Sequence, residues 1–172
     1  MGRPAVHVTL EKRSSARLSS VYRGDEEIAT FPGTAKDPDG SIRADMFIKA
    51  AGETLLKRSE RGWSAHYILA ERCLFRRNTL LELAEVRIVV STVGRQLAAP
   101  GLIEPLGPDR FFETMAFHAW KNGKFWDADI ARQLRLDSPF NLDSEDVEDQ
   151  ADAMHEAIVA EISSKMLSGK PL

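Results

Sequence analysis

Residues 111–136 read FFETMAFHAWKNGKFWDADIARQLRL, and they decide the fold that the rest of the chain must fit. Two apolar runs lie on either side of Asn122-Gly123, the strongest short-range signal for a two-residue hairpin turn. A shift of one residue from the register of that turn would scatter the apolar side chains over both faces. The sequence therefore predicts an antiparallel hairpin whose core face carries Phe111, Met115, Phe117, Ala119, Trp126, Ala128, Ile130 and Leu134.

The opposite face of this hairpin carries the first candidate site. In the predicted register His118 lies directly opposite Asp127, with Asp129 one diagonal step away. Carboxylates beside a His stabilise its charged form, which suits a general base or a metal ligand, but one His and two carboxylates make an incomplete set. Trp120 and Phe125 share this face, and aromatic side chains are enriched in interface cores. Two interpretations of this face remain open. Its polar side chains either pair with one another on a solvated surface, or the face binds a partner. We assign no catalytic residue and no metal.

An acidic helix is expected after the hairpin. Ser138-Pro139 closes the second strand, and Asp143 or Ser144 begins the helix. Residues 137–172 contain nine acidic and two basic residues, an asymmetry that favours a charged partner or simply a solvated helix face. The stripe expected to lie on the sheet consists of Val147, Ala151, Met154, Ile158, Ile162 and Met166.

The N-terminal half predicts a mixture of short strands and two amphipathic helices. Gly24-Asp25 is a turn-forming pair between β-prone stretches, and β-branched residues follow one another from Val86 to Val93, before Gly94. The expected elements are strands at 5–11, 17–23, 27–31 and 86–93 and helices at 42–58 and 65–82.

Together these elements predict an α+β fold. We expect a mostly antiparallel sheet of about five to six strands, about three helices, and a C-terminal hairpin followed by the acidic amphipathic helix. The 172 residues fit one domain. Pro100, Pro105 and Pro108 make 94–108 a Pro-rich connection, so the domain could divide into subdomains 1–93 and 109–172.

Composition narrows the setting of the protein. Hydrophobic residues make up 43% of the chain and charged residues 28%, as in folded globular proteins. A lone Cys73 forms no internal disulfide, which suits a reducing compartment. No apolar run is long enough for a signal peptide or a membrane span. We therefore expect a cytoplasmic protein that does not contact membranes.

Basic residues upstream provide an alternative site. Arg61 and His66 have the spacing of the Arg-x4-His signature, and in this respect they resemble helical HEPN ribonucleases. Arg72, Arg76 and Arg77 cluster on the helix expected at 65–82, where they could contact phosphates. Nucleic-acid binding or RNA processing through this basic helix is therefore the alternative function, beside the plainer reading of a solvated face.

The hairpin and helix also resemble a known group of proteins. Glu113-Thr114-Met115-Ala116-Phe117, followed by a second strand and a helix with Ala151, Ala153 and His155, is similar to short uncharacterised bacteriophage proteins. Those proteins begin with a Glu-Thr-Met-Val-Phe strand, and the likeness covers roughly residues 112–160. The resemblance implies a phage or mobile-element setting, in the host cytoplasm or the virion, and no specific chemistry.

The sequence lacks the common motifs of enzyme active sites. The sequence has no phosphate-binding Gly loop, no Gly-x-Ser-x-Gly elbow and no His-Glu-x-x-His helix. The leading hypothesis is therefore a non-enzymatic interaction protein that acts in virion assembly or binds a host component. We expect no cofactor, and we expect a protein partner or self-association.

Overall fold

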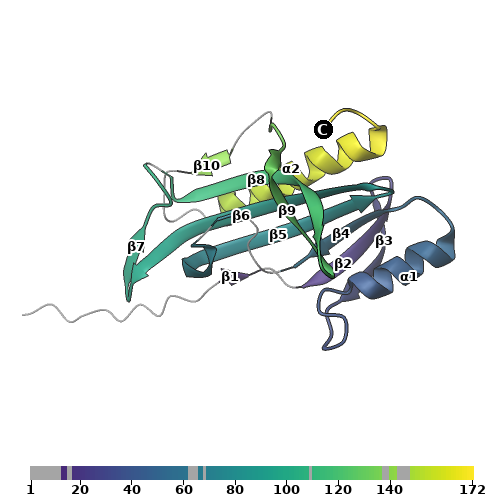
Figure 1. Ribbon diagram of the computed structural model, residues 1–172, viewed down its shortest axis with the longest axis horizontal. Helices are drawn as coiled ribbons and strands as arrows, with labels where there is room; N and C mark the ends of the chain where they lie inside the picture. Colours follow the sequence, from purple (N-terminus) through teal and green to yellow (C-terminus); the bar gives the residue numbers. More distant parts are fainter. Residues whose placement is uncertain are drawn as a thin grey trace, which may run out of the picture.

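Strands dominate the structure, which is a computed structural model (Figure 1). It describes residues 13–14, 17–61, 66–67, 69–108, 110–136, 140–142 and 148–172. Ten strands in these residues form a single, mostly antiparallel sheet, accompanied by two α-helices. The predicted α+β class is confirmed, with more strands and fewer helices than expected. The strand predicted at 5–11 lies outside the described residues.

Strands from both sides of the Pro-rich connection share this sheet. The main path through it runs β10-β8-β6-β5-β4-β2-β3, while β9 pairs with β8, β7 with β6, and β1 with β5 in the one parallel pairing described. The strands are β1 (Arg13–Ser14), β2 (Leu18–Arg23), β3 (Glu26–Pro32), β4 (Leu56–Glu60), β5 (Cys73–Leu83), β6 (Val86–Ala99), β7 (Leu102–Glu104), β8 (Phe112–Asn122), β9 (Phe125–Gln133) and β10 (Phe140–Leu142). The helices are α1 (Ser41–Ala51), the short 3-10 helix η1 (Ala70–Arg72) and α2 (Glu148–Ser168).

The C-terminal hairpin forms as predicted, but its turn lies one residue further along. Asn122 pairs with Phe125, so the loop is Gly123-Lys124. Gly123 has a φ of 60°, and a positive φ at the first loop residue alone is the requirement of a type II′ turn. A type I′ turn with Asn122-Gly123 as its two loop residues would also need a positive φ at Asn122, which the backbone does not adopt.

This shift corrects the predicted register and the predicted core face. Asp127 lies opposite Trp120 instead of His118, and a bulge between Phe117 and Ala119 then moves the pairing again. Ile130, predicted to be in the core, is 72% exposed. Both faces of β8 are in fact core. Met115, Phe117, Ala119, Trp126 and Ala128 pack with Leu80 and Val89 on one side, while Phe111, Phe112, Ala116 and Leu134 belong to the cluster beneath α2.

The helix predicted at 65–82 is wrong. Its residues form η1 and then β5, an eleven-residue strand paired with β4 and β6. Nearly every side chain from Cys73 to Leu81 is buried, and a strand buried on both faces has the same unbroken apolar character as a buried helix. The helix predicted at 42–58 is likewise shorter, because Gly52 ends α1 with a φ of 68° and β4 follows.

Gly94 does not end β6, which continues to Ala99. A Cβ atom at Gly94 would lie 2.0 Å from the ring of Phe112 on the neighbouring strand. The glycine therefore makes room for Phe112, a fully buried side chain. Its role is close packing inside the sheet, not chain termination.

The last helix lies on the sheet as predicted. Ala151, Ile158, Ile162 and Met166 are buried against β5, β6 and β8, and Met154 packs at the edge of the same cluster. The expected start at Asp143 or Ser144, and Val147, lie outside the described residues.

The β8–β9 hairpin and α1 frame a second region of the molecule. Figure 1 shows β9 crossing the sheet from β8 toward β2, while α1 packs on β2 and β3. Ala44 and Ile48 of α1 contact a cluster that includes Val21, Phe31 and Leu55. The tip of the hairpin is thereby brought close to the loop that leads into α1.

Candidate functional site

A groove of about 680 Å³ opens between the hairpin tip and the loop before α1, and we call it the hairpin groove. Its volume is within the range of about 300–1,000 Å³ typical of ligand pockets. One wall comes from residues 37–42 and the other from residues 122–127. It is lined by Arg17, Asp37, Pro38, Asp39, Ser41, Ile42, Asn122, Lys124, Phe125, Trp126 and Asp127.

Asp37 fixes the first wall of the hairpin groove. Its carboxylate accepts hydrogen bonds from the backbone amides of Ile42 (3.1 Å) and Arg43 (3.2 Å), and from Nε of Arg43 (3.0 Å). Burial alone would raise the pKa of Asp37, but the Arg43 guanidinium and the two amides lower it overall. The carboxylate is thus used to cap α1, and it holds Ile42 at the edge of the groove.

Arg61 fixes the second wall from below. Its side chain is 2% exposed. Nε and Nη2 donate to Oδ1 of Asn78 at 3.0 and 2.7 Å, and Nη1 donates to the backbone carbonyl of Trp126. Burial lowers the pKa of Arg61 to about 10, against the opposing charges of Asp127 and Asp39. This guanidinium therefore fastens the hairpin tip to β4 and β5.

Exposed apolar side chains concentrate on the two elements that flank the hairpin groove. Of the nine large apolar side chains exposed in the described residues, three lie on α1 and three on the hairpin, whereas Val86, Leu102 and Leu172 lie elsewhere. Such concentration is a mark of interaction surfaces. We define the apolar rim as Ile42, Met46, Phe47, Trp120 and Phe125, of which Ile42 (55% exposed) and Phe125 (67% exposed) line the groove itself.

Two backbone amides of β9 are already bonded by aspartate side chains. The backbone amide of Ala128 donates to Oδ1 of Asp127 at 2.9 Å, and that of Ala131 donates to Oδ1 of Asp129 at 3.2 Å. An added strand would need these amides as donors. Strand addition is therefore disfavoured at these two positions of β9.

The predicted hairpin face is divided by the observed register. Phe125 and Asp127 line the hairpin groove, and Trp120 lies directly opposite Asp127. His118 lies opposite Ile88 of β6 and does not face Asp127 as predicted. Burial and the charge of Arg132 lower the pKa of His118, opposed by Asp129. The structure therefore keeps Trp120 opposite Asp127 and moves His118 away from its predicted partner.

The basic residues of the alternative site do not form one helical face. Arg76 and Arg77 are adjacent on β5, where successive side chains point to opposite faces. Arg77 is buried and forms ion pairs with acidic residues. Arg61 is buried too and bonds to Asn78. By contrast, Arg72 is exposed and Arg76 is half-buried. His66 packs against the ring of Phe117, and burial with the charge of Arg110 lowers its pKa to about 4.

A buried hydrogen-bond chain beneath α2 was not foreseen from the sequence. His155 is 0% exposed, with Nε2 at 2.7 Å from Oγ1 of Thr79 and Nδ1 at 2.7 Å from Oγ1 of Thr92. Thr79 in turn donates to Oε1 of Glu60 at 2.5 Å, and Thr92 lies 2.7 Å from Oγ1 of Thr114. The chain joins α2 to four strands, β4, β5, β6 and β8.

The carboxylate of Glu60 fixes the direction of every bond in this chain. Burial would raise the pKa of Glu60, but Arg77 and Arg58 lower it, so the carboxylate only accepts. Thr79 must donate to it and therefore accepts from Nε2–H of His155. Nδ1 then accepts from Thr92, which accepts from Thr114. Burial and Arg77 lower the pKa of His155 to about 3, so the imidazole is neutral.

This chain is a structural tie and not an open active site. None of its five residues is more than 5% exposed, so a substrate does not reach His155 in this conformation. Within the described ranges no group of three or more His, Cys, Asp or Glu side chains is arranged to hold a metal ion. No described helix is long and apolar enough to cross a membrane.

Comparisons with known proteins found no match to this chain. No protein-family model matches the chain, and no curated protein or solved structure does so either.

The contribution of the buried Arg61 to stability can be compared with that of an exposed arginine. Replacing Arg61 with methionine should lower the free energy of unfolding by about 1–3 kcal/mol, because the buried Asn78 and Trp126 oxygens lose their donor. Amide hydrogen exchange at the hairpin tip should also accelerate. The matched control is Arg72→Met, at an exposed position, with an expected change within about 0.5 kcal/mol. If urea titrations show equal losses of stability in the two variants, Arg61 does not fasten the hairpin tip to β4 and β5.

Proposed function

We propose that this chain is a non-enzymatic interaction protein that binds a protein partner through the hairpin groove and its apolar rim. The carrying observation is that six of the nine exposed large apolar side chains described lie on α1 and the hairpin, the two elements that border the groove. Desolvating such side chains in a contact contributes about 25 cal/mol per Å² of apolar area. Tryptophan, here Trp120, is among the residues that most often dominate binding energy. Phenylalanine, here Phe125, is enriched in interface cores.

The walls of the groove are already ordered, which lowers the cost of binding. Asp37 fixes the α1 wall, and Arg61 fixes the hairpin wall from inside the molecule. On one side of Trp126, the guanidinium of Arg87 lies 4.4 Å from the ring centroid, which restrains the ring. A partner therefore meets a preformed surface with two fixed sides.

The class of partner follows from the resemblance of residues 112–160 to short bacteriophage proteins. On that basis the partner is a virion component or a host protein, and the protein acts in the host cytoplasm or the assembling particle. Binding of nucleic acid through Arg72 and Arg76 remains the second hypothesis, because these two side chains keep access to solvent. That hypothesis predicts a steep loss of affinity with salt.

Affinity capture with matched variants tests the proposed surface. We would capture the tagged protein from cells that produce it naturally, with and without nuclease, beside the double variant Ile42→Ser/Phe125→Ser. The matched control Val86→Ser/Leu102→Ser removes exposed apolar side chains outside the groove. We expect the groove variant to recover at least tenfold less of a discrete protein that survives nuclease, and the control to recover it fully.

Two outcomes contradict the proposal. The first is equal recovery by the groove variant and the wild type when both melt at the same temperature. The second is recovered material that disappears on nuclease treatment, which would favour the nucleic-acid hypothesis.

A further inference from the structure

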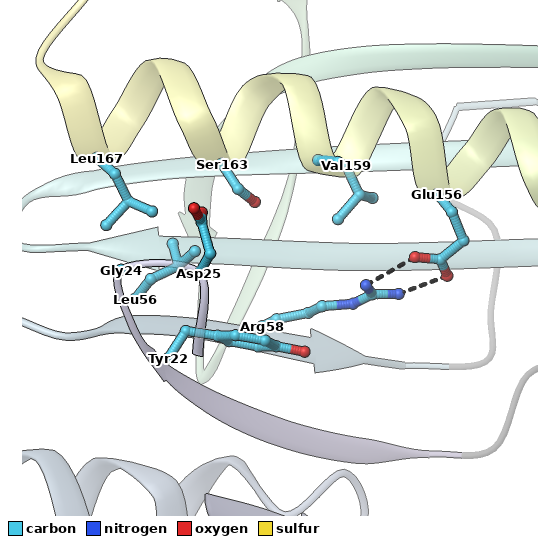
Figure 2. A pocket seen from close by; sticks show the side chains of 10 residues that line it. Tyr22, Gly24, Asp25, Leu56, Arg58, Glu156, Val159, Ser163 and Leu167 are labelled. Carbon is cyan, nitrogen blue, oxygen red and sulfur yellow. Dashed lines mark hydrogen bonds and ion pairs between the residues drawn. The ribbon is translucent and has the colours of Figure 1, made fainter. Parts of the chain in front are cut away.

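A second pocket, of about 260 Å³, lies between α2 and the β2–β3 turn (Figure 2). It is on the α2 side of the molecule and shares no lining residue with the hairpin groove. The volume is below the range of about 300–1,000 Å³ for drug-sized ligands and equals that of roughly nine molecules of liquid water. The pocket therefore fits a small molecule or a single side chain.

Part of the lining of this pocket is apolar. Leu56 of β4 and Val159 of α2 are each 3% exposed, and Leu167 and the ring of Tyr22 complete the lining. Figure 2 shows Leu167 and Val159 pointing from α2 toward the strands below. Such walls suit a chain of methylene groups, each of which contributes about 0.8 kcal/mol when buried.

The one guanidinium in the pocket, that of Arg58, is already neutralised. Nη1 and Nη2 donate to the carboxylate of Glu156 at 2.8 and 2.7 Å (Figure 2). Nε and Nη2 also donate to Glu60 at 3.1 and 2.7 Å. Burial would raise the pKa of Glu156, but Arg58 and Arg77 lower it to about 2, so this partner stays ionised. An anionic ligand would have to compete with two carboxylates for Arg58.

Asp25 places a second carboxylate in the pocket lining, in addition to that of Glu156. Figure 2 shows its carboxylate directed toward α2, and Ser163 of α2 also lines the pocket. In the part of the chain that the structure describes, the Asp25 side chain has no hydrogen bond or ion pair. The ion-pair network behind it joins two arginines, Arg58 and Arg77, to the three carboxylates of Glu60, Asp152 and Glu156. The network and Asp25 together therefore carry excess negative charge.

We infer that this pocket binds a primary alkylammonium group. The methylene stem lies between Leu56, Val159 and Leu167, and the ammonium pairs with Asp25 and donates to the hydroxyl of Ser163. An ammonium offers three donors and no acceptor, which matches a carboxylate and a hydroxyl oxygen. The group comes either from a free aliphatic diamine or from a lysine side chain of a bound protein. This site is independent of the hairpin groove.

The test is a titration of the full chain with pentylamine, followed by ¹H–¹⁵N NMR. We expect saturable shifts of the backbone amides of Gly24, Asp25 and Ser163, and at least tenfold weaker binding of pentan-1-ol, which has the same stem and no charge. Asp25→Asn should weaken pentylamine binding at least tenfold. Glu26→Gln is the matched control, because it removes the same charge from the next exposed residue, outside the pocket lining, and should change binding less than twofold.

Two further probes identify the source of the ammonium. Tighter binding of 1,5-diaminopentane than of an N-acetyl-lysine amide supports a free diamine, and the reverse order supports a lysine side chain. The inference is overturned by any of three results: no saturable shift, pentan-1-ol binding as well as pentylamine, or equal weakening in Asp25→Asn and Glu26→Gln. Asp25 is an exposed turn residue, so melting temperatures should confirm that both variants fold.

Discussion

Replacing Glu60 with alanine is expected to lower the free energy of unfolding by about 3–5 kcal/mol, the cost of removing one partner from a buried ion pair. Glu60 is 5% exposed and forms ion pairs with Arg58 at 2.7 Å and Arg77 at 3.2 Å. It also accepts the hydrogen bond of Thr79 at the end of the His155 chain. Without it, the two largely buried guanidinium groups keep, among the described residues, the ion pairs with Asp152 and Glu156, which are partly exposed.

Urea denaturation of matched variants measures this effect. Glu85→Ala is the control, since the Glu85 side chain is 100% exposed and its loss should change stability by no more than about 0.5 kcal/mol. Should Glu60→Ala fail to fold, Glu60→Gln retains an acceptor and removes the charge, and it should still lose more than 1 kcal/mol. A loss below about 1 kcal/mol in Glu60→Ala would show that the network does not hold α2 to the sheet.

Acid is expected to destabilise the protein well before its carboxylates are protonated. The folded state holds the pKa of His155 at about 3, below the ordinary value of 6.5, because of burial and the charge of Arg77. Below pH 6.5 the unfolded chain therefore binds a proton that the folded chain excludes. The stability conferred by the neutral imidazole is complete above pH 6.5 and is lost as the pH falls toward 3, by about 1.4 kcal/mol per pH unit.

His155→Gln isolates this contribution. A glutamine amide can donate to Thr79 and accept from Thr92, but it does not titrate. Between pH 6 and pH 5 the slope of stability against pH should therefore fall by about 1.4 kcal/mol per unit relative to the wild type. His66→Gln removes the other histidine with a strongly lowered pKa, about 4, so it should reduce the slope by a separate amount, and the two reductions should add in the double variant. An unchanged slope in His155→Gln would contradict a neutral buried imidazole.

The sequence predicted those elements whose signals are local. The hairpin of β8 and β9 and the buried stripe of α2 both follow from short-range periodicity, and both are present. The helix at 65–82 was mistaken because β5 is buried on both faces, and an unbroken apolar run does not distinguish a strand from a helix. The predicted register was wrong because the two loop residues are Gly123-Lys124 and not Asn122-Gly123.

The candidate site was predictable only on the hairpin side. The aromatic residues Trp120 and Phe125 are visible as a hairpin face in the sequence. The opposite wall, from Asp37 to Ile42, is about 80 residues away and meets the hairpin only because β9 crosses the sheet. The His155 chain draws one side chain from each of five elements, so no spacing along the chain reveals it.

Hydrogen exchange of the captured complex tests the central claim most directly. The protein would be compared free and bound to its captured partner, with amide exchange followed along the whole chain. We predict that protection on binding is confined to residues 37–47 and 120–127, the hairpin groove and its apolar rim. Protection centred on residues 70–77, with the groove unchanged, would contradict the proposed function and would move the site to the basic residues of η1 and β5.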